Sequence, residues 1–222
     1  MTPGYRSCCA DRSGRVGHPE PPRISNRERP SRRWARRPRD KGVEELVEAF
    51  LLLRQKFADI ILLVVGDYET RDQPSEKTKH ILATHEAVRH VGWQTDVVPF
   101  MAALDIFVLP TYREGLGTVL LEAAAMGIPT VTTKATGARD AIVDGSTGLG
   151  VPIANVGALT EALARLVQDA SLRDAMGRAG CAWVSKHFDR SEVWRRQAEE
   201  YRSLLGGAKV YTRAKSGPAQ PG

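Results

Sequence analysis

The stretch PTYREGLGTVLLEAAAMGIP, residues 110–129, decides the fold of this chain and the place of its site. A short apolar strand is expected directly before it. A loop containing Gly115 and Gly117 follows, and a helix is expected to begin near Thr118. Glycines in such a loop let the backbone approach a ligand closely, and the free N–H groups and dipole at a helix start favour an anion such as a diphosphate. The stretch therefore predicts an anion site where a strand passes into a helix.

Two carboxylates in this stretch, Glu114 in the loop and Glu122 in the helix, add to the signal. The neighbours of Glu122 within one turn are all apolar or small. An ionised glutamate buried among them would be costly without a hydrogen-bonding partner, and a ribose diol would be such a partner. The alternative is that Glu122 faces solvent on a half-buried helix. Both interpretations stay open at this point.

Strands and helices alternate along the chain on both sides of this stretch. The run IILLVVG (60–66) is typical of a strand buried on both faces. The alternation predicts an α/β fold, a Rossmann-like parallel sheet with right-handed crossovers and helices on both faces. The expected strands are 60–66, 87–91, 105–109 and 129–132, and the expected helices are 43–53, 75–84, 96–104, 118–126, 138–143, 156–167, 172–186 and 192–205.

The first strand of this fold is doubtful. A doubly wound domain should begin with a central apolar strand before its first helix, but residues 31–39 read SRRWARRPR. Arginines and a proline do not suit a strand packed between two layers of helices. Either the first strand is absent, or the sheet starts at Ile60.

Composition divides the chain into an Arg- and Pro-rich segment at 1–38 that we expect to be disordered, a folded domain at 39–205 and a flexible tail at 206–222. The formal net charge is +6, of which residues 1–40 contribute +7 and the remainder −1. A nucleic-acid-binding domain carries its charge on a folded face, so no nucleic-acid partner is expected. Without a long apolar run or a signal peptide, the sequence predicts a cytoplasmic protein.

The segment EGLGTVLLE (114–122) resembles the paired-glutamate motif of glycosyltransferase family 4, also called group 1. The resemblance continues through DKGVEELVEAF (40–50), GIPTVTT (127–133) and TGARDAIVDGSTGLGVP (136–152). It implies the GT-B architecture, whose C-terminal domain binds the nucleotide-sugar. Within the family, the YREG and TG-x-x-D forms look most like bacterial capsule and lipopolysaccharide enzymes.

The resemblance also implies roles for individual residues. Glu114 would face the transferred sugar, and Glu122 would hold the ribose hydroxyls. Lys41 would neutralise the diphosphate together with Arg36, which the spacing of the family pattern selects. The backbone of five consecutive residues would face the sugar and diphosphate, namely Gly115, Leu116, Gly117, Thr118 and Val119. The base site would be lined by Gly66, Gly92 and Trp93.

These roles describe a retaining sugar transfer from a UDP-sugar or GDP-sugar to a glycan or lipid-linked acceptor, with no cofactor. We expect no metal, because the sequence contains neither a D-x-D motif nor a His/Cys cluster. The resemblance implies that this chain holds the donor-binding half of the enzyme. Open alternatives are a catalytically inactive nucleotide-sugar-binding fragment and a GT-B-type epimerase. Peripheral association with the inner face of a membrane, and self-association through the C-terminal helices, also stay open.

Overall fold

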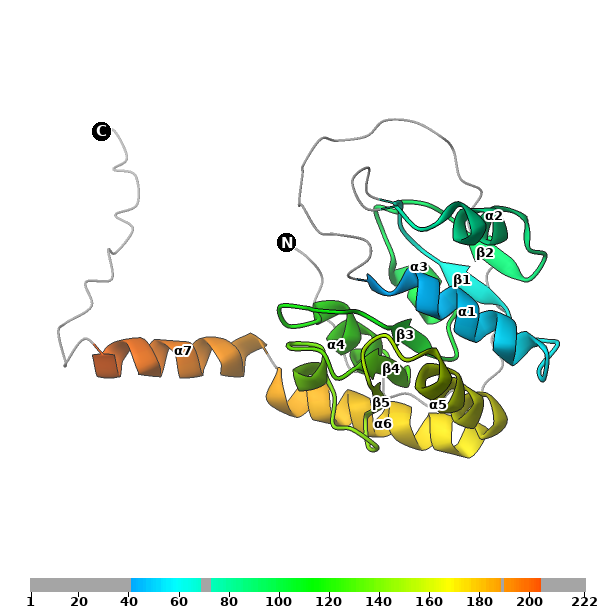
Figure 1. Cartoon of the computed structure of the whole chain (residues 1–222). Coiled ribbons are helices and arrows are strands. Elements are labelled where there is room, and N and C mark those ends of the chain that lie inside the picture. Colours follow the sequence, from blue (N-terminus) through cyan, green and yellow to red (C-terminus); the bar gives the residue numbers. More distant parts are fainter. Residues whose placement is uncertain (1–40, 69–72, 189, 205–222) are drawn as a thin grey trace, which may run out of the picture. The chain divides into compact units, whose positions relative to one another are not determined.

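The computed structural model describes residues 41–68, 73–188 and 190–204 (Figure 1). The segments expected at 1–38 and 206–222, and Arg36 with them, lie outside the described residues. The chain divides into two compact units, residues 1–184 and 185–222, and each is described by itself. All the strands that the structure describes lie in the first unit, and α7 (Arg190–Leu204) belongs to the second.

The helices and strands before α7 follow one another nearly as the sequence predicts, and α6, the last of them, extends past the end of the first unit at residue 184. In chain order they are α1 (Val43–Arg54), β1 (Leu62–Val64), α2 (Glu76–Thr84), β2 (Val88–His90), α3 (Val98–Ala102), β3 (Phe107–Leu109), α4 (Thr118–Ala125), β4 (Thr130–Thr133), η2 (Arg139–Ala141), β5 (Gly148–Val151), α5 (Val156–Gln168) and α6 (Ala170–His187). The α/β class expected from the sequence is therefore confirmed.

The strands form two parallel sheets rather than the single sheet that the alternation predicts. One sheet pairs β1 with β2, and the other has the order β3-β4-β5. β1 is also less buried than IILLVVG suggests, since all its residues are only half-buried and Ile61 just before it is 64% exposed. The expectation of a strand covered on both faces is wrong for this run.

β5 is a strand that the sequence analysis missed. Its residues, GLGV, contain glycines at alternate positions and read as a turn. Gly148 sits so close to β4 that a Cβ at this position would lie 2.4 Å from Oγ1 of Thr130. A glycine is thus needed for the two backbones to pair. The alternation of the glycines with buried Leu149 and Val151 was the available signal.

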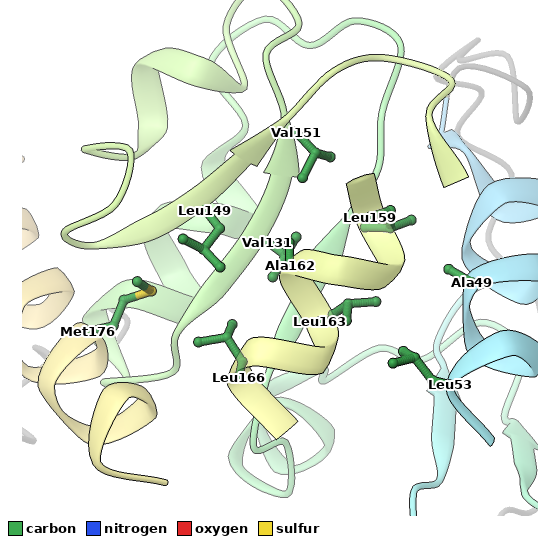
Figure 2. Packing of buried hydrophobic residues seen from close by; sticks show 10 residues of the cluster. All are labelled: Ala49, Leu53, Val131, Leu149, Val151, Leu159, Ala162, Leu163, Leu166 and Met176. Carbon is green, nitrogen blue, oxygen red and sulfur yellow. The ribbon is translucent and has the colours of Figure 1, made fainter. Parts of the chain in front are cut away.

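The core of the first unit is built on α5. Its buried residues Leu159, Ala162, Leu163 and Leu166 recur at helical spacing and form one face. Figure 2 shows this face directed towards Val131, Leu149 and Val151 of the β4–β5 sheet, with Ala49 and Leu53 of α1 at its side. The side chain of Asn155 caps the start of α5 by accepting a hydrogen bond from the N–H of Ala158 at 2.8 Å.

Helix α1 packs on both sheets. Its Ala49 and Leu53 belong to the cluster around α5, whereas Val47 and Phe50 belong to a second cluster with Val88 of β2. The helix begins after Gly42, whose φ of 64° is left-handed. A Cβ at Gly42 would lie 2.1 Å from the carbonyl oxygen of Pro110, so the start of α1 lies directly against the end of β3.

In the part of the chain that the structure describes, no helix combines the length and the apolar character needed to cross a membrane.

Candidate functional site

The loop after β3 packs against the segment that follows β4. The N–H of Glu114 donates to the carbonyl oxygen of Thr136 at 3.1 Å. Gly137, with φ 79°, lies so close that a Cβ would be 2.3 Å from the carbonyl oxygen of Glu114 and 2.1 Å from that of Gly115. The position and orientation of the Glu114–Gly115 peptide therefore depend on a glycine at 137. The sequence analysis gave Thr136 and Gly137 no role in the site, although a Thr-Gly pair shortly after a strand is a turn signal.

The helix that follows the loop begins as predicted. Gly117 is the N-cap of α4 with φ 61°, and Thr118 is its first residue. No side chain caps this end of the helix, which leaves the first N–H groups for another acceptor. Gly115, Leu116 and Thr118 are exposed, and Leu116 reaches 44%. The helix start thus combines exposure with the positive end of the helix dipole, the physical requirements of an anion site.

Lys41 and Glu114, separated by 73 positions in the sequence, form a hydrogen-bonded ion pair between Nζ and Oε1. The side chain of Glu114 is only 4% exposed, whereas that of Lys41 is 31% exposed. A buried carboxylate is stable only with a compensating charge or hydrogen bond, and Lys41 provides one. The structure thus brings together Lys41 and Glu114, two of the residues to which the resemblance gives a role.

A second contact ties α1 to the same loop. The hydroxyl of Tyr112 donates to the carboxylate of Glu45. This hydrogen bond, with burial and the negative charge of Glu45, raises the pKa of Tyr112 to about 12. The sequence analysis missed this pair because its members are 67 positions apart and a contact over such a separation cannot be derived from local patterns. Together with Gly42 against Pro110, it fixes the start of α1 beside the loop.

Glu122 is exposed on α4, between the buried residues Leu121 and Ala123. The apolar neighbours seen in the sequence therefore line the other faces of the helix. Although its surface is accessible, partial burial of the carboxyl group raises the pKa of Glu122 above its ordinary value. Protein atoms thus remove part of the hydration of this carboxylate.

Gly66 and Gly92 meet in a turn after β1 and β2. The N–H of Gly66 donates to the carbonyl oxygen of Gly92 at 2.8 Å, and both glycines have positive φ. His90 joins them, since its Nε2 lies 2.8 Å from the carbonyl oxygen of Gly66 and its ring packs 4.9 Å from that of Tyr68. His90 is therefore a packed residue. Trp93 follows the turn with 57% of its surface exposed.

The candidate residues thus fall into two groups. Lys41, Glu114 and the start of α4 lie at the carboxyl end of β3, and Gly66, Gly92 and Trp93 follow β1 and β2. In open α/β sheets, ligands bind outside the carboxyl ends of the strands, where the strand order reverses. Both groups lie at the carboxyl ends of strands, β3 for the first group and β1 and β2 for the second. Among the described residues, no group of three or more His, Cys, Asp or Glu side chains is arranged to hold a metal ion.

The sequence of the chain matches the family described as "Glycosyl transferases group 1" over residues 33–169. It is 34% identical over 167 residues to the capsular polysaccharide biosynthesis glycosyltransferase CapM of Staphylococcus aureus, covering 75% of this chain and 44% of CapM. This chain therefore spans less than half the length of that relative.

Two solved structures extend the comparison. Anabaena HepE in complex with UDP superimposes with a TM-score of 0.69 at 26% identity, over 77% of this chain and 48% of HepE. The C-terminal domain of the group 1 glycosyl transferase LpcC of Francisella tularensis gives a TM-score of 0.63 at 25% identity, over 68% of this chain and 82% of that domain. The likeness thus covers most of an isolated C-terminal domain.

Proposed function

Because the chain belongs to the group 1 glycosyltransferases, we propose that its folded region, residues 39–205, binds a nucleoside-diphosphate sugar and forms the donor side of a retaining sugar transfer. The observation that carries the proposal is the uncapped start of α4 beside the Lys41–Glu114 pair. Donor N–H groups, a helix dipole and a cation then converge where a diphosphate would lie.

The diphosphate would be held by the N–H groups of Gly117, Thr118 and Val119 and by Lys41. Breaking the bond between sugar and diphosphate builds negative charge on the leaving group, and donors fixed in advance stabilise that charge without reorganisation. Lys41 would have to exchange part of its contact with Glu114 for the phosphate. Arg36 would add a second cation by its spacing in the family pattern.

Glu114 would receive hydroxyl groups of the transferred sugar once Lys41 turns towards the phosphate. The backbone of Gly115 and Leu116 would line the same sugar. Glu122, exposed and partly desolvated, would accept hydrogen bonds from the ribose hydroxyls. Gly66, Gly92 and Trp93 would line the base, whose edge can be recognised by the backbone of the turn.

UDP is the first nucleotide to test, since HepE was solved with it. Isothermal titration of the chain with UDP, GDP and UDP-glucose, in buffer containing EDTA, measures binding without added metal. The Glu122→Gln variant should lose about 1–3 kcal/mol of binding free energy, the scale of a hydrogen bond to a charged group. Glu161→Gln, an exposed glutamate on α5, is the matched control and should bind as the parent does. Unchanged affinity of a folded Glu122→Gln variant would exclude the ribose role.

The acceptor is expected to be a glycan or a lipid-linked glycan, met at the cytoplasmic face of the membrane by peripheral association. Self-association through α7 is part of the same proposal, supported by Trp194 and Tyr201, which are 60% and 59% exposed. Sedimentation of the chain with liposomes and size-exclusion chromatography test these points. A strictly monomeric chain that never sediments with vesicles argues against both.

The alternative is a chain that binds donor without transferring it. The residues to which we give roles all lie on the donor side, whereas positioning an acceptor contributes roughly 7–11 kcal/mol to a reaction of this kind. We therefore expect the 222-residue chain by itself to bind UDP-sugar but to show no measurable transfer of radiolabelled sugar to lipid extracts. Robust turnover by the isolated chain would contradict this expectation.

A further inference from the structure

The three threonines of β4 differ in what their hydroxyl groups contact. Thr130, Thr132 and Thr133 are all buried, with at most 1% of each residue exposed. Oγ1 of Thr132 donates to the carbonyl oxygen of Leu109 at 2.7 Å, and Oγ1 of Thr133 donates to that of Thr111. Oγ1 of Thr130 has no hydrogen-bond partner among the described residues. Two of the three hydroxyls thus bond to the end of β3 and to the loop after it.

These hydroxyl groups continue the contact between β4 and the chain of β3 beyond the end of the strand. β3 ends at Leu109, and the proline that follows has no N–H with which to extend the ladder. The carbonyl oxygen of Thr111 accepts from the hydroxyl of Thr133. Oγ1 of Thr111 in turn donates to the carbonyl oxygen of Arg113 at 2.9 Å. A relay of two hydroxyls, those of Thr133 and Thr111, therefore leads from β4 to the residue before Glu114.

The hydroxyl relay ends on the peptide group that carries Glu114. The carbonyl oxygen of this peptide belongs to Arg113 and accepts from Thr111. Its N–H belongs to Glu114 and donates to the carbonyl oxygen of Thr136 at 3.1 Å. Because a peptide group is planar, hydrogen bonds to both of its polar groups fix its plane. The direction in which the side chain of Glu114 leaves the loop follows from that plane.

Burial makes the hydroxyl relay stiff. Thr111 is 0% exposed and Thr133 is 1% exposed, so water does not replace either hydroxyl as a donor. β4 is itself buried over its whole length and pairs with β3 on one side and β5 on the other. A β-branched side chain has a restricted χ1, so the direction of the Thr133 hydroxyl follows from the backbone of β4. The relay thus transmits the position of the central strand to Glu114.

The carboxylate of Glu114 depends on this position. Its side chain is only 4% exposed and pairs with Lys41, a residue 73 positions away. A small rotation of the peptide before Glu114 would move the carboxylate away from Nζ of Lys41. The same rotation would displace the carboxylate from the transferred sugar in the function proposed above.

We propose that Thr111 and Thr133 are positioning residues, whose hydroxyl groups hold the carboxylate of Glu114 in place for Lys41 in the free chain and for the sugar of the donor. Because they act through Glu114, they determine how strongly the chain prefers a sugar nucleotide over the nucleotide alone. The part of this inference that concerns the sugar rests on the proposed function, whereas the part that concerns Lys41 does not.

Binding of UDP-glucose and of UDP to the full chain tests the role towards the sugar. In Thr133→Val and Thr111→Val, the ratio of the Kd for UDP-glucose to the Kd for UDP should rise at least about tenfold, the scale of a lost hydrogen bond to a charged group. The Kd for UDP alone should change less than about threefold. Thr133→Ser and Thr111→Ser keep the hydroxyl and should keep the parent's ratio. A parent-like ratio in the valine variants, or an equal rise in the serine variants, overturns the proposal.

Thr130→Val is the matched control, because Thr130 lies in the same strand, is equally buried and has a hydroxyl without a partner among the described residues. This variant should keep the parent's ratio, and a rise equal to that of Thr133→Val overturns the proposal. Glu114→Gln is the reference and should raise the ratio as the valine variants do. If Glu114→Gln leaves the ratio unchanged, or if the parent binds neither ligand, the proposed function fails, and a measurement without ligand decides on the positioning role.

That measurement is the cost of Lys41→Met in urea unfolding. Because Thr133→Val moves Glu114 away from Lys41, the cost should fall by at least about half in the Thr133→Val background. In the Thr130→Val background it should equal the cost in the parent. An undiminished cost in the Thr133→Val background overturns the positioning role. In the unmutated chain, NMR should also detect slowly exchanging hydroxyl protons at Thr111 and Thr133, and fast exchange at both overturns the role even if no valine variant folds.

Discussion

Replacing Gly137 by alanine should loosen the loop that carries Glu114. Gly137 has φ 79°, which costs a residue with a Cβ about 1–2 kcal/mol. The new methyl group would also lie 2.1 Å from the carbonyl oxygen of Gly115 and 2.3 Å from that of Glu114. Because both atoms belong to backbone, relief requires a shift of the loop, and such overpacking costs about 1–3 kcal/mol more.

Gly145 provides a matched control for the backbone term. Its φ of 80° is the same within a degree, and a Cβ there would meet nothing within 4 Å. Gly145→Ala should therefore show the conformational cost alone. For a chain of this size, 1 kcal/mol corresponds to about 2–4 °C in Tm, so Gly137→Ala should melt roughly 2–12 °C below Gly145→Ala. Differential scanning fluorimetry measures both variants side by side.

The two variants should also differ in nucleotide binding. Displacement of the Glu114–Gly115 peptide moves the loop that leads to the start of α4, so Gly137→Ala should weaken UDP-glucose binding at least about tenfold, or ~1.4 kcal/mol. Gly145→Ala should bind as the parent does. If the two variants melt together and bind equally, the contact between residue 137 and the loop does not position Glu114, and the reasoning fails.

Two further predictions concern the start of α1. Lys41→Met removes the cation beside the buried carboxylate of Glu114 and should cost about 1–3 kcal/mol in urea unfolding; adding Glu114→Gln should recover part of that cost, and strictly additive effects would show that the pair is not coupled. The hydrogen bond to Glu45 holds the pKa of Tyr112 at about 12, above the 10.0 of a free tyrosine. The neutral phenol is therefore favoured by folding, so its stabilisation is complete below pH 10 and is lost as the pH rises towards 12. In Tyr112→Phe, the melting temperature should fall less between pH 10 and pH 12 than in the parent chain. An unchanged dependence of the melting temperature on pH would count against the hydrogen bond.

Local patterns predicted most of the elements. The run before residue 110, the glycines of the loop and the apolar periodicity after Thr118 locate β3, the loop and α4 correctly, because each signal lies within a few residues. β5 was not predicted. Its Gly148 is required by the close approach of Thr130 in β4, a residue 18 positions earlier in the sequence. The division into two sheets could not be derived from the sequence, since strand pairing is a long-range property.

The residues of the candidate site also fall into those that the sequence predicted and those that it did not. Glu114, Glu122 and the glycines could be selected from one stretch and from the family resemblance, and the structure places Lys41 against Glu114. Their proposed roles remain to be tested. The roles of Gly137 and of the Tyr112–Glu45 pair were not predicted, because they come from contacts between segments that are far apart in the sequence.

Because α1 packs against both sheets, it affects whether the two sheets unfold together. A helix whose Leu53 supports one cluster and whose Phe50 supports another couples the melting of the two sheets. While α1 holds, calorimetric and van't Hoff enthalpies should agree, as for a single cooperative unit. Truncation of Phe50 alone would release the β1–β2 half first and divide one transition into two. Among the described residues, the 12-residue helix α1 is thus a main link between the two sheets.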